Sequence, residues 1–180
     1  MKKFVNDPKQ FVPEMLKGIQ LANPGKLKYV PEYNLIMRAD APNENKVSIV
    51  QGSGSGHEPA HVMVVGKGML DAACPGDVFA APPSDYGYET TKLMASPKGV
   101  LHIINNYTGD RMAFDMGREL AEAEDIKIAT IIVDDDVAVK DSTYTVGRRV
   151  WPATSSSSRR SAPRRRRARS STSWSSSASA

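Results

Sequence analysis

Two apolar segments on either side of a segment with helical periodicity constrain the fold of this chain more than any other feature. Residues 99–104 (GVLHII) and 126–133 (IKIATIIV) have the composition of buried strands. Between them, Met112, Met116 and Leu120 recur every four residues, with Ala113 and Ala121 alongside, which indicates a helix with these side chains in the core. A strand, a helix and a strand in this order form the βαβ unit of a parallel sheet. The sequence therefore predicts an α/β fold, a mostly parallel sheet flanked by helices.

Weaker signals of the same architecture occur elsewhere in the first 149 residues. We expect a further helix directly after the glycine-rich residues 51–57. The other expected elements are a helix over residues 8–22, strands over 34–38, 46–50 and 77–80, and a helix that starts with a cap at Ser84-Asp85 and ends before Pro97.

The charge of the chain is divided unevenly along its length. Residues 151–180 contain 12 Ser and 7 Arg and no acidic residue. Subtracting these 7 charges from the 24 Lys and Arg of the chain leaves 17 against 20 Asp and Glu, a net charge of −3 for residues 1–150. A mildly acidic body argues against an Arg/Ser-rich RNA-binding protein. We expect residues 1–149 to form an incomplete domain and residues 150–180 to be a disordered low-complexity tail.

Several classes of protein are disfavoured by the sequence. A single cysteine, Cys74, excludes an internal disulfide framework and a Cys-based zinc site, and we expect it to be buried. The basic start is followed by no apolar run of signal-peptide length, and no stretch approaches the roughly 20 apolar residues that span a bilayer. We expect a cytoplasmic protein that binds neither a membrane nor nucleic acid.

Two loops that follow predicted strands are candidates for a binding site. Residues 51–57 (QGSGSGH) are rich in glycine, and residues 105–110 (NNYTGD) precede the predicted helix. In parallel sheets ligands bind at the carboxyl ends of the strands, so we expect both loops to line one crevice. Gly52, Gly54 and Gly56 would let the backbone approach a ligand closely.

The titratable residues near these loops have competing interpretations. Residues 57–61 (HEPAH) match the zincin motif, but a proline does not fit the middle of a zincin helix, and we expect no metal site. His57 fits better as a lone acid/base group, because its ordinary pKa suits proton transfer near neutral pH. His61 and His102 are expected to pack in the core. Asp110 either caps the next helix or faces the same crevice as His57.

Four short motifs occur in order along the chain and together are far more specific than either loop alone. They are residues 54–61 (GSGHEPAH), 66–70 (GKGML), 76–80 (GDVFA) and 106–110 (NYTGD). Through these motifs, residues 1–149 resemble the N-terminal part of the substrate-binding subunit, or domain, of dihydroxyacetone kinase. The resemblance implies an α/β fold, a homodimer at full length, and a ketose kinase that phosphorylates dihydroxyacetone (glycerone).

The resemblance also implies roles for residues of both loops. The backbone around Gly54, Ser55 and Gly56 would bind the small ketose. His57 would bind the substrate and act as an acid/base group, and Asp110 would be the base that activates the accepting hydroxyl for phosphoryl transfer.

Two departures from the family pattern affect these expectations. Asn105, at a substrate-binding position, stands where family members often carry lysine, so a four-carbon ketose such as erythrulose is a rival substrate. Family members also hold the substrate covalently through a later histidine, whereas no histidine follows His102. The phosphate donor, ATP with Mg or a phosphocarrier protein, would come from a separate domain or subunit, with no cofactor bound by this chain. The alternative is a non-catalytic ketose-binding regulatory relative.

The residues that follow Arg149 indicate a change of reading frame. Their Ser, Arg, Ala and Pro bias is typical of GC-rich DNA read out of frame. Trp151 and Trp174 are encoded only by TGG, so a frame shifted by one nucleotide places Leu, Met or Val there. We therefore expect a one-nucleotide deletion near codon 149. The resulting chain would be truncated, inactive alone, and would expose apolar surface that the missing segment covers.

Overall fold

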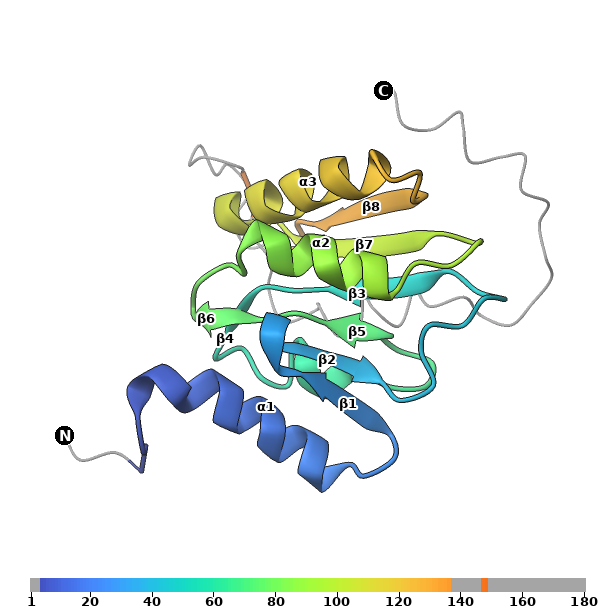
Figure 1. Cartoon of the computed structure of the whole chain (residues 1–180). Coiled ribbons are helices and arrows are strands. Elements are labelled where there is room, and N and C mark those ends of the chain that lie inside the picture. Colours follow the sequence, from blue (N-terminus) through green and yellow to red (C-terminus); the bar gives the residue numbers. More distant parts are fainter. Residues whose placement is uncertain (1–3, 137–146, 149–180) are drawn as a thin grey trace.

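The computed structural model describes residues 4–136 and 147–148. At its centre is a six-stranded sheet with the strand order β1-β2-β5-β3-β7-β8 (Figure 1). These strands are β1 (Leu27–Val30), β2 (Leu35–Arg38), β5 (Ala72–Ala73), β3 (Ser48–Gln51), β7 (Val100–Asn105) and β8 (Ile128–Val133). The strands β5, β3, β7 and β8 are parallel, and β2 runs antiparallel to both of its neighbours. The predicted mostly parallel α/β sheet is confirmed.

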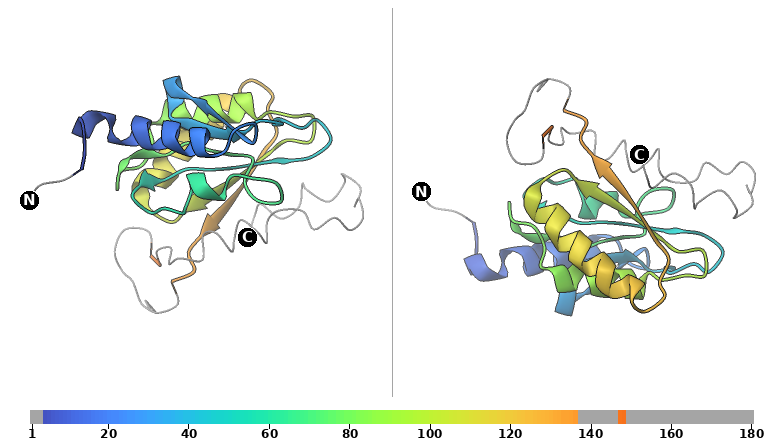
Figure 2. Two further views of the ribbon diagram at one scale, coloured as in Figure 1. Left: turned by 90° about the horizontal axis from the view of Figure 1, so that it is seen from below. Right: turned by 90° about the horizontal axis from the view of Figure 1, so that it is seen from above.

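Helices cover both faces of this sheet. The helix α1 (Phe11–Ala22) follows a short 3-10 turn, η1 (Pro8–Gln10), and packs with Val12 and Leu16 on the face that carries Ile49 and Ile103. On the opposite face, α2 (Ser84–Leu93) and α3 (Thr108–Glu122) lie side by side (Figures 1 and 2). Phe114 of α3 is fully buried there in a second apolar cluster. The cap of α2 is Pro83 rather than the predicted Ser84-Asp85.

The predicted core face of α3 is right for Ala113 and Ala121, which are buried, and wrong for its larger residues. Met112, Met116 and Leu120 are all more than half exposed. The buried side of the helix carries Asp110, Ala113, Phe114, Gly117 and Ala121. This side of α3 faces α2, and the two helices approach each other closely. A Cβ on Gly117 would lie 2.9 Å from the backbone nitrogen of Tyr88. Only a residue without a side chain fits at Gly117, so this side of α3 faces α2, with Phe114 filling the second apolar cluster, and Met112, Met116 and Leu120 face outward.

The chain after β3 also differs from the prediction. No helix follows the glycine-rich residues directly, because residues 57–61 form turns and only a short 3-10 helix, η3 (Val62–Val64), comes next. The glycine-rich segment itself forms β4 (Gly54–Ser55), which pairs in parallel with β6 (Gly76–Val78) in a separate two-stranded sheet. The predicted tail and the frame change near codon 149 lie outside the described residues.

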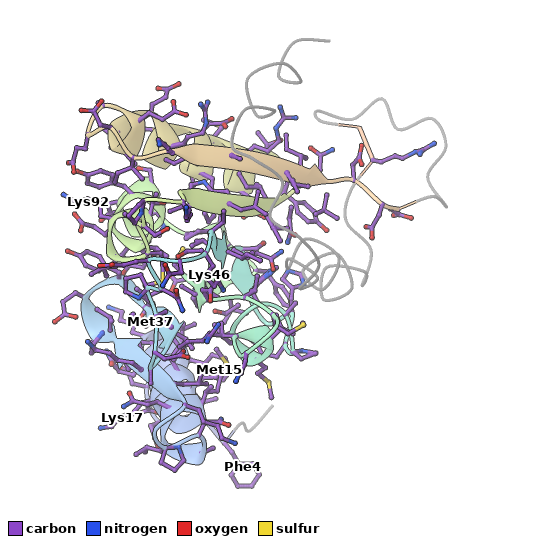
Figure 3. All side chains as sticks on the ribbon, turned by 90° about the vertical axis from the view of Figure 1, so that its right-hand side faces the viewer. Phe4, Met15, Lys17, Met37, Lys46 and Lys92 are labelled. Atoms are coloured by element: carbon purple, nitrogen blue, oxygen red, sulfur yellow. The ribbon has the colours of Figure 1, made fainter. Side chains whose placement is uncertain are left out.

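At the amino ends of the parallel strands, a buried carboxylate connects three strands. Asp71 accepts hydrogen bonds from Arg38 Nη1 at 2.8 Å, from Lys46 Nζ at 2.6 Å and from the backbone nitrogen of Ile49 at 2.9 Å. Figure 3 labels Lys46 on this side of the molecule. The exposed carboxylate of Asp40 binds the outer edge of the same Arg38 guanidinium at 2.8 and 2.6 Å. These bonds fix the start of β3 against β2 and β5.

The strand β8 forms one end of the sheet in the part of the chain that the structure describes. It pairs along its whole length with β7. Ile131 and Ile132 point to opposite faces of the sheet, and both are more than 40% exposed, at 43% and 42%.

Candidate functional site

The carboxyl ends of β3 and β7 bring the two predicted loops together. These strands are parallel neighbours, with Gln51 beside Ile103. The loop after β3 and the start of α3 are joined by a hydrogen bond in which Ser53 Oγ donates to Asp110 Oδ2 at 2.6 Å. The structure therefore places residues 51–57 and 105–110 at one end of the sheet, the left side of Figure 1.

Asp110 is a buried carboxylate in the first turn of α3. Its side chain does not cap the helix, because the cap is Tyr107 and the Asp110 carboxylate binds Ser53 instead. Burial raises the pKa of Asp110 to about 6, and the hydrogen bond from Ser53 opposes part of that rise. A carboxylate that titrates near neutral pH is suited to accept a proton from a substrate hydroxyl.

The glycines of the loop allow close packing against the chain itself. A Cβ on Gly52 would lie 2.4 Å from the carbonyl oxygen of Cys74, and one on Gly54 would lie 2.6 Å from the backbone nitrogen of Ala80. At Gly56 the φ of +98° also favours glycine. The Ser55 hydroxyl donates to the carbonyl oxygen of Gly76 at 2.7 Å. Close approach of the backbone to a ligand, as predicted, is therefore not needed to explain Gly52 and Gly54.

Substituting Gly54 with alanine is expected to lower the free energy of unfolding by about 1–3 kcal/mol, because the new methyl group would overlap backbone atoms that cannot move aside. Gly66→Ala is the matched control. Nothing lies within 4 Å of a Cβ there, so its change should stay within about 1 kcal/mol. Urea unfolding of the three proteins measures both values, and equal stabilities of the two variants would contradict the packing explanation.

His57 lies at the exposed end of the same loop. Its imidazole packs edge to face on the ring of Phe79, with the ring centroids 5.2 Å apart and the planes at 73°. The neighbouring Glu58 accepts a hydrogen bond from the backbone nitrogen of Gly56 at 2.9 Å. The hydrogen bond of Asp110 goes to Ser53. His57 and Asp110 therefore lie on the two loops that meet at this end of the sheet, one exposed and the other buried.

Asn105 is held by buried polar side chains. Its Oδ1 accepts from Gln51 Nε2 at 3.4 Å, and its Nδ2 lies 3.4 Å from His61 Nε2. All three residues are buried. The sequence placed Gln51 and Ser53 in the candidate loop after the predicted strand 46–50, but no signal in it assigned either residue a role. These contacts hold the Asn105 amide within the protein.

The two remaining histidines are core residues, as expected, but each has one unsatisfied ring nitrogen. Burial lowers the pKa of His61 to about 3 and that of His102 to about 4. The Nε2 of His102 lies 2.8 Å from Thr91 Oγ1, and its ring packs against Phe114. The Nδ1 atoms of both histidines are buried without a partner. Cys74 is fully buried, as predicted, and burial raises the pKa of its thiol to about 12.

The structure gives no support to a zincin arrangement. Residues 57–61 form turns, so His57 and His61 do not share the face of a helix. Residues 4–136 and 147–148 contain no group of three or more His, Cys, Asp or Glu residues that could hold a metal ion. In the same part of the chain, no helix is both long enough and apolar enough to cross a membrane.

Comparison with known proteins gives consistent matches. The Dak1 domain family matches residues 17–157. The chain is 49% identical over 148 residues to the dihydroxyacetone-binding subunit DhaK of the PTS-dependent dihydroxyacetone kinase of Lactococcus lactis, covering 82% of this chain and 44% of the relative. It is 46% identical over 150 residues to the corresponding subunit of the PEP-dependent kinase of Escherichia coli, covering 83% and 42%. This chain thus spans less than half the length of the curated relatives it matches.

Solved structures agree with the sequence matches. The crystal structure of the dihydroxyacetone kinase from C. freundii in complex with AMP-PNP and Mg2+ superposes with a TM-score of 0.78 at 36% identity, covering 85% of this chain and 28% of the other. A dihydroxyacetone kinase operon co-activator superposes with a TM-score of 0.70 at 40% identity, covering 76% and 41%.

Proposed function

Because this chain belongs to the Dak1 domain family, we propose that it is the ketose-binding part of a dihydroxyacetone (glycerone) kinase, a phosphotransferase. The observation that carries the proposal is the buried Asp110 carboxylate, bonded to Ser53 of the glycine-rich loop where β3 and β7 end. The curated relatives at 46–49% identity are kinase subunits, so the regulatory alternative is not favoured.

The proposed reaction assigns one step to each loop. A short ketose binds against the loop that contains Gly54, Ser55 and Gly56, with one hydroxyl toward Asp110. The Asp110 carboxylate accepts the proton of this hydroxyl while the oxygen attacks the phosphorus of the donor, whose bond to the phosphoryl group breaks so that the dephosphorylated donor leaves. His57 donates a hydrogen bond to the substrate from the exposed end of the loop and serves as an acid/base group.

The substrate is the three-carbon ketose dihydroxyacetone or a related four-carbon ketose such as erythrulose. A relative from Solanum lycopersicum, 43% identical over 153 residues, is named a putative 3,4-dihydroxy-2-butanone kinase, which supports this range of sizes. The contacts of Asn105 with Gln51 and His61 favour a neutral amide that shapes the wall of the site.

The phosphate donor in this proposal belongs to another domain or subunit. ATP with Mg or a phosphocarrier protein supplies the phosphoryl group, and this chain contributes the acceptor site. The relatives named PTS-dependent and PEP-dependent kinases support a separate donor protein. We place the complete protein in the cytoplasm, as a homodimer that acts in glycerol metabolism and binds neither a membrane nor nucleic acid.

Asp110→Asn tests the proposed base. In the chain extended to the full length of its relatives and supplied with a donor subunit, this change is expected to slow transfer by about 10²–10⁴-fold, because the proton acceptor is lost. Ketose affinity, measured by calorimetry with dihydroxyacetone and erythrulose, should be largely kept because asparagine has nearly the same shape.

The matched control is Asp115→Asn, which removes an exposed carboxylate from the same helix. It should leave the rate of transfer unchanged. Turnover of the Asp110 variant at the normal rate would refute the role of Asp110, and binding of neither ketose by the unmutated chain extended to full length would refute the proposed function itself.

A further inference from the structure

Phe79 is held in an unfavourable position by its surroundings. It follows β6 with a φ of +56°, in the left-handed region that a bulky residue rarely adopts. Its side chain is 71% exposed, and the residue belongs to neither apolar cluster of the described core. A large exposed ring at a strained position gains little from burial, so its presence needs another explanation.

Phe79 contacts the glycine-rich loop at several points. Its backbone nitrogen donates to the carbonyl oxygen of Ser55 at 2.8 Å. Its Cα would lie 2.8 Å from a Cβ on Gly54, and its ring carbon Cε1 would lie 2.9 Å from a Cβ on Gly56. The absence of side chains at both glycines therefore lets the segment after β6 lie directly on the loop. The left-handed turn at Phe79 places its ring beside His57.

We propose that Phe79 is a positioning residue that orients the imidazole of His57. The edge-to-face contact at 5.2 Å restricts the rotation of an otherwise exposed side chain. The ring of Phe79 also lies against Gly56, so it restricts the glycine-rich loop and the His57 imidazole together. The consequence for ketose binding rests on the proposed function, since it requires His57 to contact the substrate.

The strained backbone provides a way to separate positioning from folding. Phe79→Gly removes the ring and also removes the strain at the positive φ, so this variant should fold at least as well as the unmodified chain. Phe79→Leu keeps the apolar character and the strain without the ring, and Phe79→Tyr keeps the ring. Phe11→Leu, which removes a partly exposed ring from α1, is the matched control.

The experiment is a proton–carbon NMR spectrum of the His57 ring in the full chain, with urea unfolding of each variant. We expect the His57 resonance to move in Phe79→Gly and Phe79→Leu and to keep its position in Phe79→Tyr and Phe11→Leu. In calorimetry with dihydroxyacetone on the chain extended to the full length of its relatives, the two variants without the ring should bind about two- to tenfold more weakly, and Phe79→Tyr should keep the affinity.

Each outcome bears on a distinct claim. An unmoved His57 resonance in a folded Phe79→Gly protein would overturn the positioning role, and so would unchanged ketose affinity in a chain that binds dihydroxyacetone. If the unmutated chain extended to full length binds no ketose, the proposed function fails, while the NMR comparison still decides whether Phe79 orients His57.

Discussion

Asp71→Asn is expected to lower the free energy of unfolding by about 3–5 kcal/mol, because it removes the charge that pairs two cations at the amino ends of the strands. The carboxylate of Asp71 is 3% exposed and accepts bonds from Arg38, from Lys46 and from the backbone of Ile49. A neutral amide offers a single acceptor oxygen, and its NH2 group would face these donors. Lys46 would then lose its carboxylate partner, and Arg38 would keep only its pair with the exposed Asp40.

Asp40→Asn is the matched control for this prediction. Asp40 binds the same Arg38 guanidinium, but its side chain is 69% exposed. Water and salt screen such a pair, so its loss should lower the free energy of unfolding by no more than about 1 kcal/mol. Urea unfolding at pH 7 measures both variants, and similar losses for the two would show that burial does not determine the strength of these ion pairs.

Asp110→Asn is expected to stabilise the chain above pH 6. Burial raises the pKa of Asp110 to about 6, from 3.8 in the unfolded chain. Between these values the folded protein holds a proton that the unfolded chain has lost, so the stability associated with this group decreases as the pH rises through 6. A shift of about 2 units corresponds to about 3 kcal/mol. Asparagine has no charge to bury and should recover about 2–3 kcal/mol at pH 7.5.

The pH dependence identifies the source of this gain. At pH 4 the carboxyl group is protonated in the folded protein and about half protonated in the unfolded chain, so the two proteins should differ by less than about 1 kcal/mol. His61 and His102 have lowered pKa values and destabilise the fold as the pH falls below 6.5, but they do so equally in both proteins. Urea unfolding at pH 4, 5, 6 and 7.5 tests the difference, and a gain that is independent of pH would contradict desolvation as its cause.

The loop residues of the site could be predicted from the sequence because their positions follow from chain order. Strands over residues 99–104 and 126–133 with a helix between them require a parallel sheet, and the loops after parallel strands meet at one end. This reasoning placed Asp110 near the glycine-rich loop, where the bond to Ser53 is found.

The register of α3 could not be predicted from periodicity. Two sets of residues in α3 repeat with a helical period. One set is Met112, Met116 and Leu120, and the other is the buried set that includes Ala113 and Gly117. The choice between them depends on how closely α2 approaches, which is a property of the packed structure. The same holds for Gly54, whose neighbours Phe79 and Ala80 come from a distant segment.

The outer strand of the sheet has a consequence for the behaviour of this chain at high concentration. Among the described residues, β8 has a bonded neighbour on one side only, and its six residues, IATIIV, contain no charge and no proline. Natural edge strands usually carry a charged residue or a proline, because the unpaired backbone groups of an edge strand are a template for strand addition by another molecule. Self-association through β8 would therefore increase with protein concentration, and a lysine in place of Ile131 would reduce it while leaving the buried face of α3 intact.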